Sequence, residues 1–220
     1  MKKAIHVMGP PGSGKGTQAD LIAESYGLTH FDIGRHFKNL IKDKDPLMTP
    51  DLIEQFDGGI LINPHKFLGL VKKRIEKLAE EGNGIVFSGQ PRTLTEAFGD
   101  EKLKGFMDFL GGIYSKENIL IFKLDISEEV TIDRNSHRLA CSSCKKDSIS
   151  RDAKACSFCG GKLYRRKDDE LEIIKIRLKE YRERTEPIFE RLKQEGFKVI
   201  EIDGTPAPKD VFKNIKEHLQ

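Results

Sequence analysis

Five short apolar runs along the chain alternate with longer stretches in which apolar and charged residues share a helical spacing. Each run is rich in β-branched or aromatic side chains, which is typical of strands buried on both faces of a parallel sheet. The runs are residues 3–8, Leu28–Phe31, Gly84–Phe87, Asn118–Leu124 and Phe197–Ile202. Leu28–Phe31 is the shortest, and its pattern is the weakest of the five.

Two of the intervening stretches place apolar residues three and four apart, which is the spacing of one helix face. The first face comprises Phe67, Leu70, Val71, Ile75 and Leu78. The second comprises Leu171, Ile174, Leu178, Tyr181, Ile188 and Leu192. Because proline cannot donate a backbone hydrogen bond, we expect Pro187 to bend or divide the second helix. The alternation of strand and helix predicts an α/β fold with a parallel sheet.

Two segments break this alternation and predict small insertions on a central core. Residues 32–62 carry short helical patterns interrupted by Pro46 and Pro50, and they contain no strand pattern. Residues 134–165 are polar and glycine-rich and contain all four cysteines. The core would then be assembled from three segments, residues 1–31, 63–133 and 166–220.

Composition limits the classes of protein to which the chain can belong. A length of 220 residues supports one substantial core with small insertions. No apolar run is long enough to span a bilayer, and the first residues lack the pattern of a signal peptide, so we expect a cytoplasmic protein without a membrane partner. The net charge of +3 does not by itself indicate nucleic-acid binding. We expect a monomer.

The strongest local motif is Gly9-Pro10-Pro11-Gly12-Ser13-Gly14-Lys15-Gly16-Thr17. It follows a predicted strand and precedes a predicted helix over Gln18–Glu24, which is the context of a phosphate-binding loop. Glycines allow the backbone N–H groups to surround an anion, and the helix N-terminus adds partial positive charge. Lys15 can then reach the β- and γ-phosphates of a nucleoside triphosphate. The alternative is a glycine-rich turn that only caps a helix. Gly16 stands where a Mg²⁺-binding Ser or Thr often follows the lysine, and Thr17 comes one position later.

This loop, continued by Gln18-Ala19, resembles the phosphate loop of adenylate kinases, and further motifs appear in the order found in that family. They are Ser88-Gly89-Gln90-Pro91-Arg92-Thr93, Asp133-Arg134 with Arg138, Arg166-Lys167-Asp168-Asp169 with Arg177, and Ile202-Asp203-Gly204-Thr205. Together the motifs cover nearly the whole chain. The resemblance implies a three-layer P-loop fold with a central parallel five-stranded sheet, a nucleoside monophosphate-binding insertion at 32–62 and a mobile lid at 134–165.

The resemblance also implies an activity, the reversible Mg²⁺-dependent transfer of the γ-phosphoryl group of ATP to AMP, which gives two ADP. The implied catalytic residues are Lys15, Arg92, Arg134, Arg166 and Arg177. The implied ATP-binding residues are Gly12, Ser13, Gly14, Lys15, Gly16, Thr17, Arg134, Arg138 and Pro206. The implied acceptor-binding residues are Ile33, Lys38, Ile60, Leu61, Ile62, Gly89, Gln90, Pro91, Arg92, Glu96, Arg166 and Arg177.

Phosphoryl transfer explains why several arginines are needed. The reaction brings negative charges together, so the protein contributes mostly positioning and electrostatic stabilisation. Arginine forks bind phosphate oxygens in pairs and stay charged at any physiological pH. For a single helix residue such as Arg177, the alternative is an ion pair with a neighbouring carboxylate on the surface.

Cys141-Ser142-Ser143-Cys144 and Cys156-Ser157-Phe158-Cys159 form a paired CxxC pattern. Two such pairs can hold Zn²⁺ with four thiolates at Cys141, Cys144, Cys156 and Cys159. Disulfides are the alternative, and they are disfavoured in the cytoplasm. The adenylate kinase family includes members with a structural zinc at this place in the lid. A four-cysteine set leaves no open coordination position, so we expect the zinc to stabilise the lid rather than to take part in catalysis.

The acceptor side departs from the family pattern at several positions. Ile33 replaces a threonine near the acceptor base, and Lys38 replaces an arginine on the acceptor phosphate. Glu96 stands where adenine-selective members have glutamine; a carboxylate only accepts hydrogen bonds and would suit guanine, unless the side chain simply faces solvent. Ser88 and Arg35 replace two aspartates near the magnesium site. Asp32 is a candidate partial substitute for them.

These departures leave two alternatives open beside AMP phosphorylation. One is a kinase with a different or relaxed acceptor base, such as GMP, CMP or UMP. The other is a nucleotide-binding protein with impaired catalysis. A third reading, nucleic-acid binding through the cysteine segment, is disfavoured because Phe158 and Tyr164 are the only aromatic residues there on which bases could stack.

Overall fold

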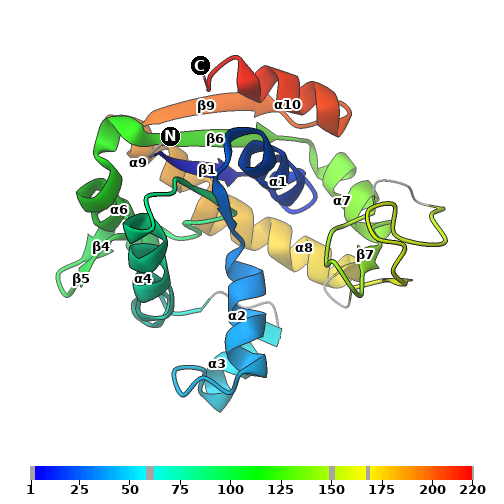
Figure 1. The fold of residues 1–220 in the computed structure, drawn as a ribbon, viewed down its shortest axis with the longest axis horizontal. Helices are drawn as coiled ribbons and strands as arrows, with labels where there is room; N and C mark the ends of the chain where they lie inside the picture. Colours follow the sequence, from blue (N-terminus) through cyan, green and yellow to red (C-terminus); the bar gives the residue numbers. More distant parts are fainter. Residues whose placement is uncertain (1–2, 58–61, 149–151, 167–168, 220) are drawn as a thin grey trace.

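A five-stranded parallel sheet forms the centre of the molecule (Figure 1). The computed structural model describes residues 3–57, 62–148, 152–166 and 169–219. The strand order is β2-β3-β1-β6-β9. The bounds are β1 Ala4–Met8, β2 Thr29–Phe31, β3 Ile85–Ser88, β6 Ile119–Asp125 and β9 Lys198–Asp203. All five strands match the apolar runs of the sequence, so the predicted parallel sheet is confirmed.

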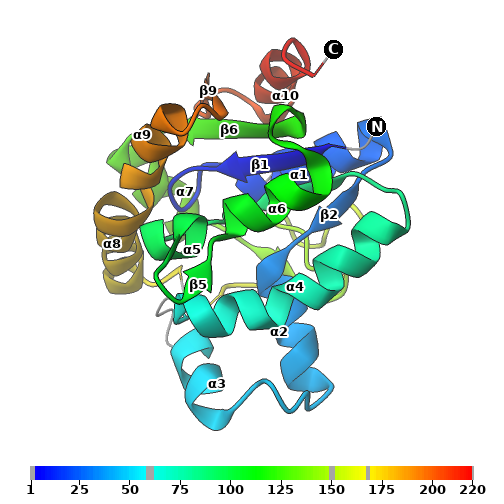
Figure 2. The ribbon, with the colours of Figure 1, turned by 90° about the vertical axis from the view of Figure 1, so that its left-hand side faces the viewer.

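Helices cover both faces of the sheet, because the strand residues alternate between two apolar clusters. On one face, Ile5, Val7 and Phe122 pack with residues of α1 (Lys15–Tyr26) and α10 (Pro208–Lys216). On the other face, Ala4, Met8 and Phe87 pack with residues of three helices, α4, α6 and α9. Their bounds are Pro64–Glu80, Phe106–Tyr114 and Pro187–Gln194. Figure 2 shows α4 and α6 on this side, together with α5 (Leu94–Phe98). The predicted three-layer architecture is confirmed.

The long C-terminal helical segment is divided just before its proline. It comprises α8 (Leu171–Glu180), a π-helical turn over Tyr181–Thr185 and then α9. The N–H of Glu186 bonds to the carbonyl of Tyr181 at 2.8 Å, an i to i−5 contact. Since Pro187 cannot donate to the preceding turn, the wider π-helical spacing joins the two α-helices.

Residues 32–57 extend away from the sheet and contain two helices, α2 (Ile33–Lys42) and α3 (Pro50–Asp57) (Figure 1). The ring of Phe37 contacts those of Phe56 and Phe67 at centroid distances of 5.8 and 6.1 Å, which attaches α2 to α3 and α4. The two helices are therefore an extension of the main apolar cluster, and they do not have a separate core.

The remaining elements are short. The cysteine segment follows α7 (Glu128–Ser136) and contains a two-stranded ribbon of β7 (Ala140–Cys141) and β8 (Leu163–Tyr164). A second ribbon pairs β4 (Gly99–Asp100) with β5 (Leu103–Lys104), and Lys116–Asn118 form a 3₁₀ turn before β6. Among the described residues, no helix combines the length and the apolar character that crossing a bilayer requires.

Candidate nucleotide site

The glycine-rich loop connects the carboxyl end of β1 to the N-terminus of α1, where a phosphate loop belongs. Gly12 has φ +78°, and a Cβ there would lie 2.6 Å from Nδ2 of Asn135. Gly14 caps α1 in the left-handed region at φ 87°. Side chains at these two positions would strain the turn or collide with α7. The loop can therefore approach a ligand closely, and the first N–H groups of α1 are directed toward it.

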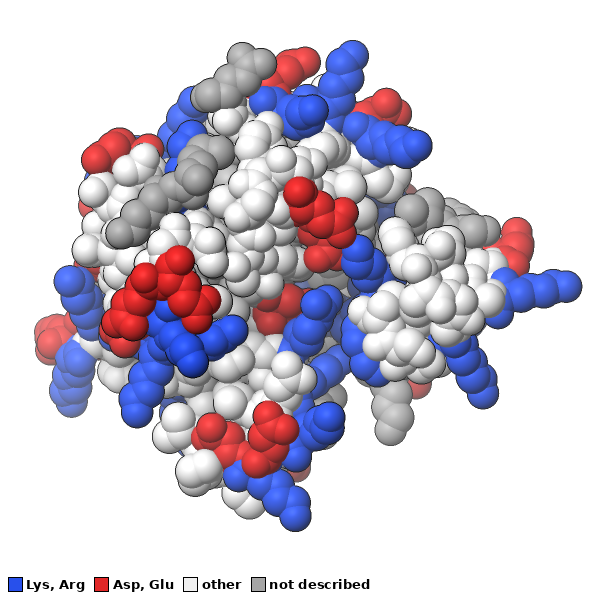
Figure 3. Space-filling model, in the orientation of Figure 1, with Lys and Arg blue, Asp and Glu red and all other residues white. Residues whose placement is uncertain are grey.

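Lys15 lies in a pocket at the centre of the cationic residues predicted from the sequence. Burial lowers the pKa of Lys15 well below its ordinary value, and the charges of Arg177, Arg92, Arg138 and Arg166 lower it further. The pocket is lined by Met8, Gly9, Pro11, Lys15, Gly89, Arg92, Arg177, Glu180, Tyr181 and Thr185. Like charges held this close favour a ligand with several negative charges. Figure 3 shows lysine and arginine side chains gathered between the lobe of α2 and α3 and the lobe of the cysteine segment.

Arg92 is held by the turn that follows β3. Its Nε donates to the carbonyl of Gly89 at 3.0 Å, and its own carbonyl accepts from Oγ1 of Thr185 at 2.9 Å. Burial lowers the pKa of the Arg92 guanidinium, while the carboxylates of Glu96 and Asp32 act to raise it. The backbone of the turn is thus fixed on both sides, and Arg92 reaches the Lys15 pocket.

His6 anchors the same turn and was not identified from the sequence. It lies in β1, fully buried, with its ring stacked on Phe87 at 4.8 Å and edge-on to Phe106 at 5.9 Å. Its Nδ1 lies 2.9 Å from the carbonyl of Gln90, so Nδ1 carries the proton. Burial lowers the pKa of His6 to about 4. A neutral histidine inside the sheet therefore positions the loop that carries Arg92.

The remaining arginines come from α7, the cysteine segment and α8. Arg134 donates to the carbonyls of Gly204 at 2.9 Å and Thr205 at 2.8 Å, which ties α7 to the loop that precedes Pro206. Arg138 forms a forked ion pair with Asp169 through its Nε at 2.9 Å and through Nη2. Arg177 lies 4.0 Å from the same carboxylate, whose side chain is only 4 % exposed. Asp169 therefore gathers two of the predicted arginines.

The acceptor-side residues are only partly brought together. Ile33 is buried at the start of α2, Lys38 is exposed on the same helix, and Ile62 packs on the main apolar cluster. Ile60 and Leu61 lie outside the described residues.

Asp32, the candidate replacement for the missing aspartates, caps α2. Its Oδ1 accepts from the backbone N–H of Arg35 at 3.0 Å, and its Oδ2 lies 3.8 Å from the Arg35 guanidinium. Both oxygens therefore have partners within their own helix turn.

Glu96 does not face solvent, so that alternative is wrong. Its side chain is buried, and Oε2 accepts from the backbone N–H of Arg92 at 3.1 Å, while its own N–H bonds to Oγ1 of Thr93 at 3.1 Å. This is a capping arrangement at the start of α5, and it turns the carboxyl group inward. Burial raises the pKa of Glu96 to about 7, against the lowering effect of Arg92. Oε1 is buried and has no hydrogen-bond partner among the described residues.

A second histidine that was not identified from the sequence lies near the phosphate loop. Nδ1 of His30 is 2.7 Å from Oδ1 of Asp20, and Nε2 is 2.9 Å from Oγ of Ser88. Ser88 was singled out only as a departure from the family pattern. The structure shows that its hydroxyl is one end of a three-residue chain of hydrogen bonds.

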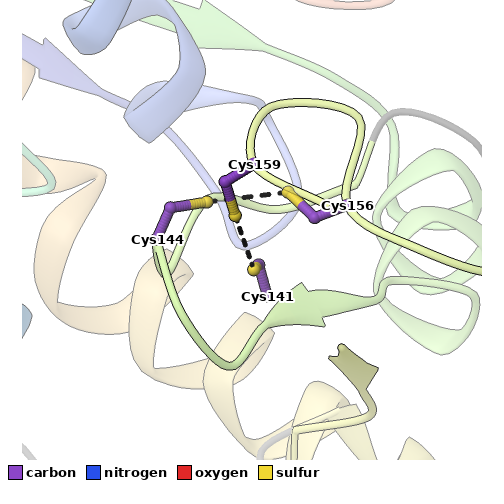
Figure 4. A group of neighbouring side chains, drawn as sticks. All are labelled: Cys141, Cys144, Cys156 and Cys159. Atoms are coloured by element: carbon purple, nitrogen blue, oxygen red, sulfur yellow. Dashed lines mark hydrogen bonds between the residues drawn. The ribbon is translucent and has the colours of Figure 1, made fainter. Parts of the chain in front are cut away.

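The four cysteines form one compact group (Figure 4). Their sulfur atoms all lie within 4.8 Å of one another, with Cys141 and Cys159 at 3.5 Å and Cys144 and Cys156 at 3.6 Å. A disulfide would require about 2 Å, so the disulfide alternative is wrong. Four thiolates about 2.3 Å from a tetrahedral Zn²⁺ would be about 3.8 Å apart, and the group fits that geometry.

Comparison with known proteins gives a consistent family. A model described as "Adenylate kinase" matches residues 7–197. The chain is 34% identical to an adenylate kinase of Clostridium tetani, with 98% of this chain and 97% of the relative covered. It is 33% identical to an adenylate kinase of Carboxydothermus hydrogenoformans, with 97% and 98% covered. It is also similar to an adenylate kinase of Methanosarcina barkeri, at 30% identity with 98% of each chain covered.

The low pKa of His6 predicts a pH-dependent stability. The unfolded imidazole takes up a proton near pH 6.5 but the folded one only near pH 4, so the free energy of unfolding falls as the pH is lowered through this window. Between pH 7.5 and 5 we expect His6 to account for a loss of about 2 kcal/mol.

His6→Asn keeps a donor for the Gln90 carbonyl but does not titrate. Urea unfolding at both pH values should show that the variant loses about 2 kcal/mol less than the parent protein. Glu96 titrates in both proteins, so its contribution cancels from the difference. An equal loss in both proteins would show that His6 does not titrate as described.

Proposed function

Because the chain belongs to the adenylate kinase family, we propose that it transfers the γ-phosphoryl group of ATP to AMP, reversibly and with Mg²⁺, giving two ADP. The chain is a nucleoside monophosphate kinase, a phosphotransferase. The observation that carries the finer proposal is the group of cations around Lys15. Two nucleotides placed end to end present a chain of phosphates, and a pocket with cations on several sides suits the transfer of a phosphoryl group between them.

On the donor side, we assign the phosphates of ATP to Gly12–Thr17, with Lys15 on the β- and γ-phosphates. Arg134 and Arg138 complete the donor site, and Pro206 lies beside the adenine. Arg134 supports this assignment because it already joins the loop after β9 to the phosphate loop, through the carbonyls of Gly204 at 2.9 Å and Gly12 at 3.4 Å. The magnesium ion that accompanies ATP supplies neutralisation of the phosphate charge.

On the acceptor side, we assign the phosphate of AMP to Arg92 and Lys38, with Arg166 and Arg177 shared with the transferred group. Gly89, Gln90 and Pro91 support the acceptor as the turn that holds Arg92. The acceptor base is placed by Ile33, Ile60, Leu61, Ile62 and Glu96. Arg92 is the best supported of these residues, since its guanidinium and both ends of its backbone are fixed.

We further propose that residues 32–62 bind the acceptor and that residues 134–165 form a lid, both attached to the core of 1–31, 63–133 and 166–220. Closure of the two insertions excludes water, which would otherwise compete as the phosphoryl acceptor. Lys146 supports a docked lid because its Nζ lies 3.0 Å from Oε1 of Glu24 on α1.

The preferred acceptor base depends on the protonation state of Glu96. As a carboxylate, Glu96 would accept from the two adjacent donors of guanine. As a neutral acid, it carries an O–H that can donate to N1 of adenine. The pKa of about 7 places both forms within reach at neutral pH. A relaxed acceptor preference, with GMP beside AMP, is therefore the second candidate function.

A coupled assay with AMP, GMP, CMP and UMP as acceptors tests the proposal. We expect ADP formation from ATP and AMP with the largest kcat/KM of the four. If AMP is the poorest acceptor, the chain is a kinase for a different base. If a bisubstrate dinucleotide binds but none of the four acceptors turns over, the chain has kept nucleotide binding and lost efficient transfer.

The protonation of Glu96 predicts a pH-dependent KM. Between pH 6 and pH 8 the side chain loses the proton that donates to adenine, so the KM for AMP should rise roughly threefold to tenfold, the value of about one hydrogen bond. Glu96→Gln, whose amide does not titrate, serves as the matched control and should show no such rise beyond the titration of AMP itself. A parallel rise in both proteins would remove Glu96 from the base site.

We also propose that the four cysteines hold a structural zinc ion. None of the described lid residues belongs to either apolar cluster. A bound metal ion would cross-link the lid and stabilise its fold. Purified protein should contain about one zinc per chain, and its removal by a chelator should lower the melting temperature.

Cys159→Ser should reproduce the loss of melting temperature, while Ser157→Ala, between the ligands, should not. The KM for AMP should change less than the KM for ATP, because the lid faces the donor side. An unchanged melting temperature after zinc removal would contradict the structural role.

A further inference from the structure

Asp20, His30 and Ser88 form a continuous chain of hydrogen bonds from α1 through β2 to the end of β3. Oδ1 of Asp20 lies 2.7 Å from Nδ1 of His30, and Nε2 of His30 lies 2.9 Å from Oγ of Ser88. The His30 side chain is only 8 % exposed, so it has little access to water as a substitute partner. The parallel pairing of β2 with β3 brings His30 close to Ser88, and the packing of α1 against these strands adds Asp20.

The chain ends at the phosphate pocket. Ser88 is the last residue of β3, and the next residue, Gly89, lines the pocket together with Lys15 and Arg92. A Cβ at Gly89 would lie 3.2 Å from Cε of Lys15, so the backbone beside Ser88 is in contact with the phosphate-loop lysine. Ser88 therefore directly precedes a residue of the pocket wall, next to the turn that carries Arg92.

The chain determines which way the serine hydroxyl points. An ionised Asp20 only accepts, so when the His30 ring carries a single N–H, that N–H is at Nδ1. Nε2 then offers a lone pair, and the hydroxyl proton of Ser88 must be donated to it. The oxygen of Ser88 is left with lone pairs alone, and toward the pocket it acts only as an acceptor.

The charges around the chain keep Asp20 ionised. Burial acts to raise the pKa of Asp20, but the hydrogen bond from His30 and the charges of Lys146 and Arg35 act to lower it, and the pKa is held below its ordinary value. Glu24 is the other acidic group here, and it pairs with Lys146 at 3.0 Å.

An oxygen that can only accept hydrogen bonds does not bind a phosphate oxygen, but it does bind a hydrogen-bond donor. We propose that Asp20 and His30 hold Ser88 as the hydrogen-bond acceptor for a water molecule bound to the Mg²⁺ ion that accompanies ATP. Metal-bound water is a strong donor because the ion polarises its O–H bonds. Ser88 accepts the hydrogen bond from the water, and His30 is a positioning residue that orients the Ser88 hydroxyl. This inference rests on the proposed function, since it requires a magnesium–nucleotide complex in the Lys15 pocket.

The test is an equilibrium measurement that needs no turnover. Calorimetric titration with a non-hydrolysable ATP analogue, at a series of Mg²⁺ concentrations, gives the apparent Mg²⁺ affinity of the protein–nucleotide complex. Ser88→Ala and His30→Phe should each weaken this affinity roughly threefold to tenfold, about the value of one hydrogen bond. Binding of the analogue without Mg²⁺ should change little.

A double-mutant cycle separates positioning from a general loss of structure. If His30 acts through Ser88, the protein with both substitutions should bind Mg²⁺ no more weakly than Ser88→Ala alone. A carboxylate needs no orienting partner, so Ser88→Asp should make the Mg²⁺ affinity insensitive to His30→Phe. His65→Phe is the matched control, because it removes a histidine–aspartate pair of 2.9 Å for which the described residues show no serine as a second partner.

Melting temperatures show whether each variant is folded. If His30→Phe does not fold, Asp20→Ala is the alternative variant, because the Asp20 side chain is 25 % exposed. Without Asp20, the N–H of His30 is no longer fixed at Nδ1, so the Mg²⁺ affinity should also fall. Additive losses in the double mutant, or a Mg²⁺ affinity unchanged by Ser88→Ala, would overturn the inference and leave the kinase assignment intact. Failure of the analogue to bind at any Mg²⁺ concentration would instead contradict the proposed function.

Discussion

Mutual repulsion of positive charges around Lys15 is the constraint on which the rest of the site depends. Burial and four arginines act together to lower the pKa of Lys15, so the pocket is costly to form until an anion enters it. The structure offsets this repulsion locally. Lys15 donates to the carbonyl of Pro10 at 2.8 Å, and Asp169 pairs with Arg138. These supports are a backbone carbonyl and the buried carboxylate of Asp169, and a phosphate chain can replace them without rearrangement of the sheet.

Burial, and not repulsion by the cations, shifts the pKa values of two other titratable groups near the pocket. His6 holds the Arg92 turn from inside the sheet, and its lowered pKa keeps it uncharged near neutral pH. Glu96 caps α5 from a buried position, where desolvation raises its pKa. Ser88 ends a chain that begins at an ionised Asp20 on α1, the helix that follows the phosphate loop. The fixed negative charges that do occur face arginine, lysine or histidine partners, so the pocket itself stays positive.

The cysteine segment differs from the rest of the molecule in how its fold is stabilised. Its short ribbon of β7 and β8 cannot bury enough apolar surface to be ordered by itself. Four convergent sulfur atoms provide the compact centre that this segment otherwise lacks. Its connection to the core is polar, through Lys146 and Glu24 and through Arg138 and Asp169.

The sequence by itself determined the parts whose signal is local. The five strands are predicted from apolar runs of a few residues. The phosphate loop is predicted from its glycines and lysine, and the metal site from the spacing of its cysteines. The tertiary structure alone decided the rest, because the partners are distant along the chain. His6 and Gln90 are 84 positions apart, His30 and Ser88 are 58 apart, and Arg138 and Asp169 are 31 apart. No periodicity links such pairs. The order of strands in the sheet brings the two histidine pairs within hydrogen-bond distance. Arg138 and Asp169 meet where the chain leaves α7 and where it returns just before α8. These tertiary contacts set the protonation of the histidines and the orientation of the arginines.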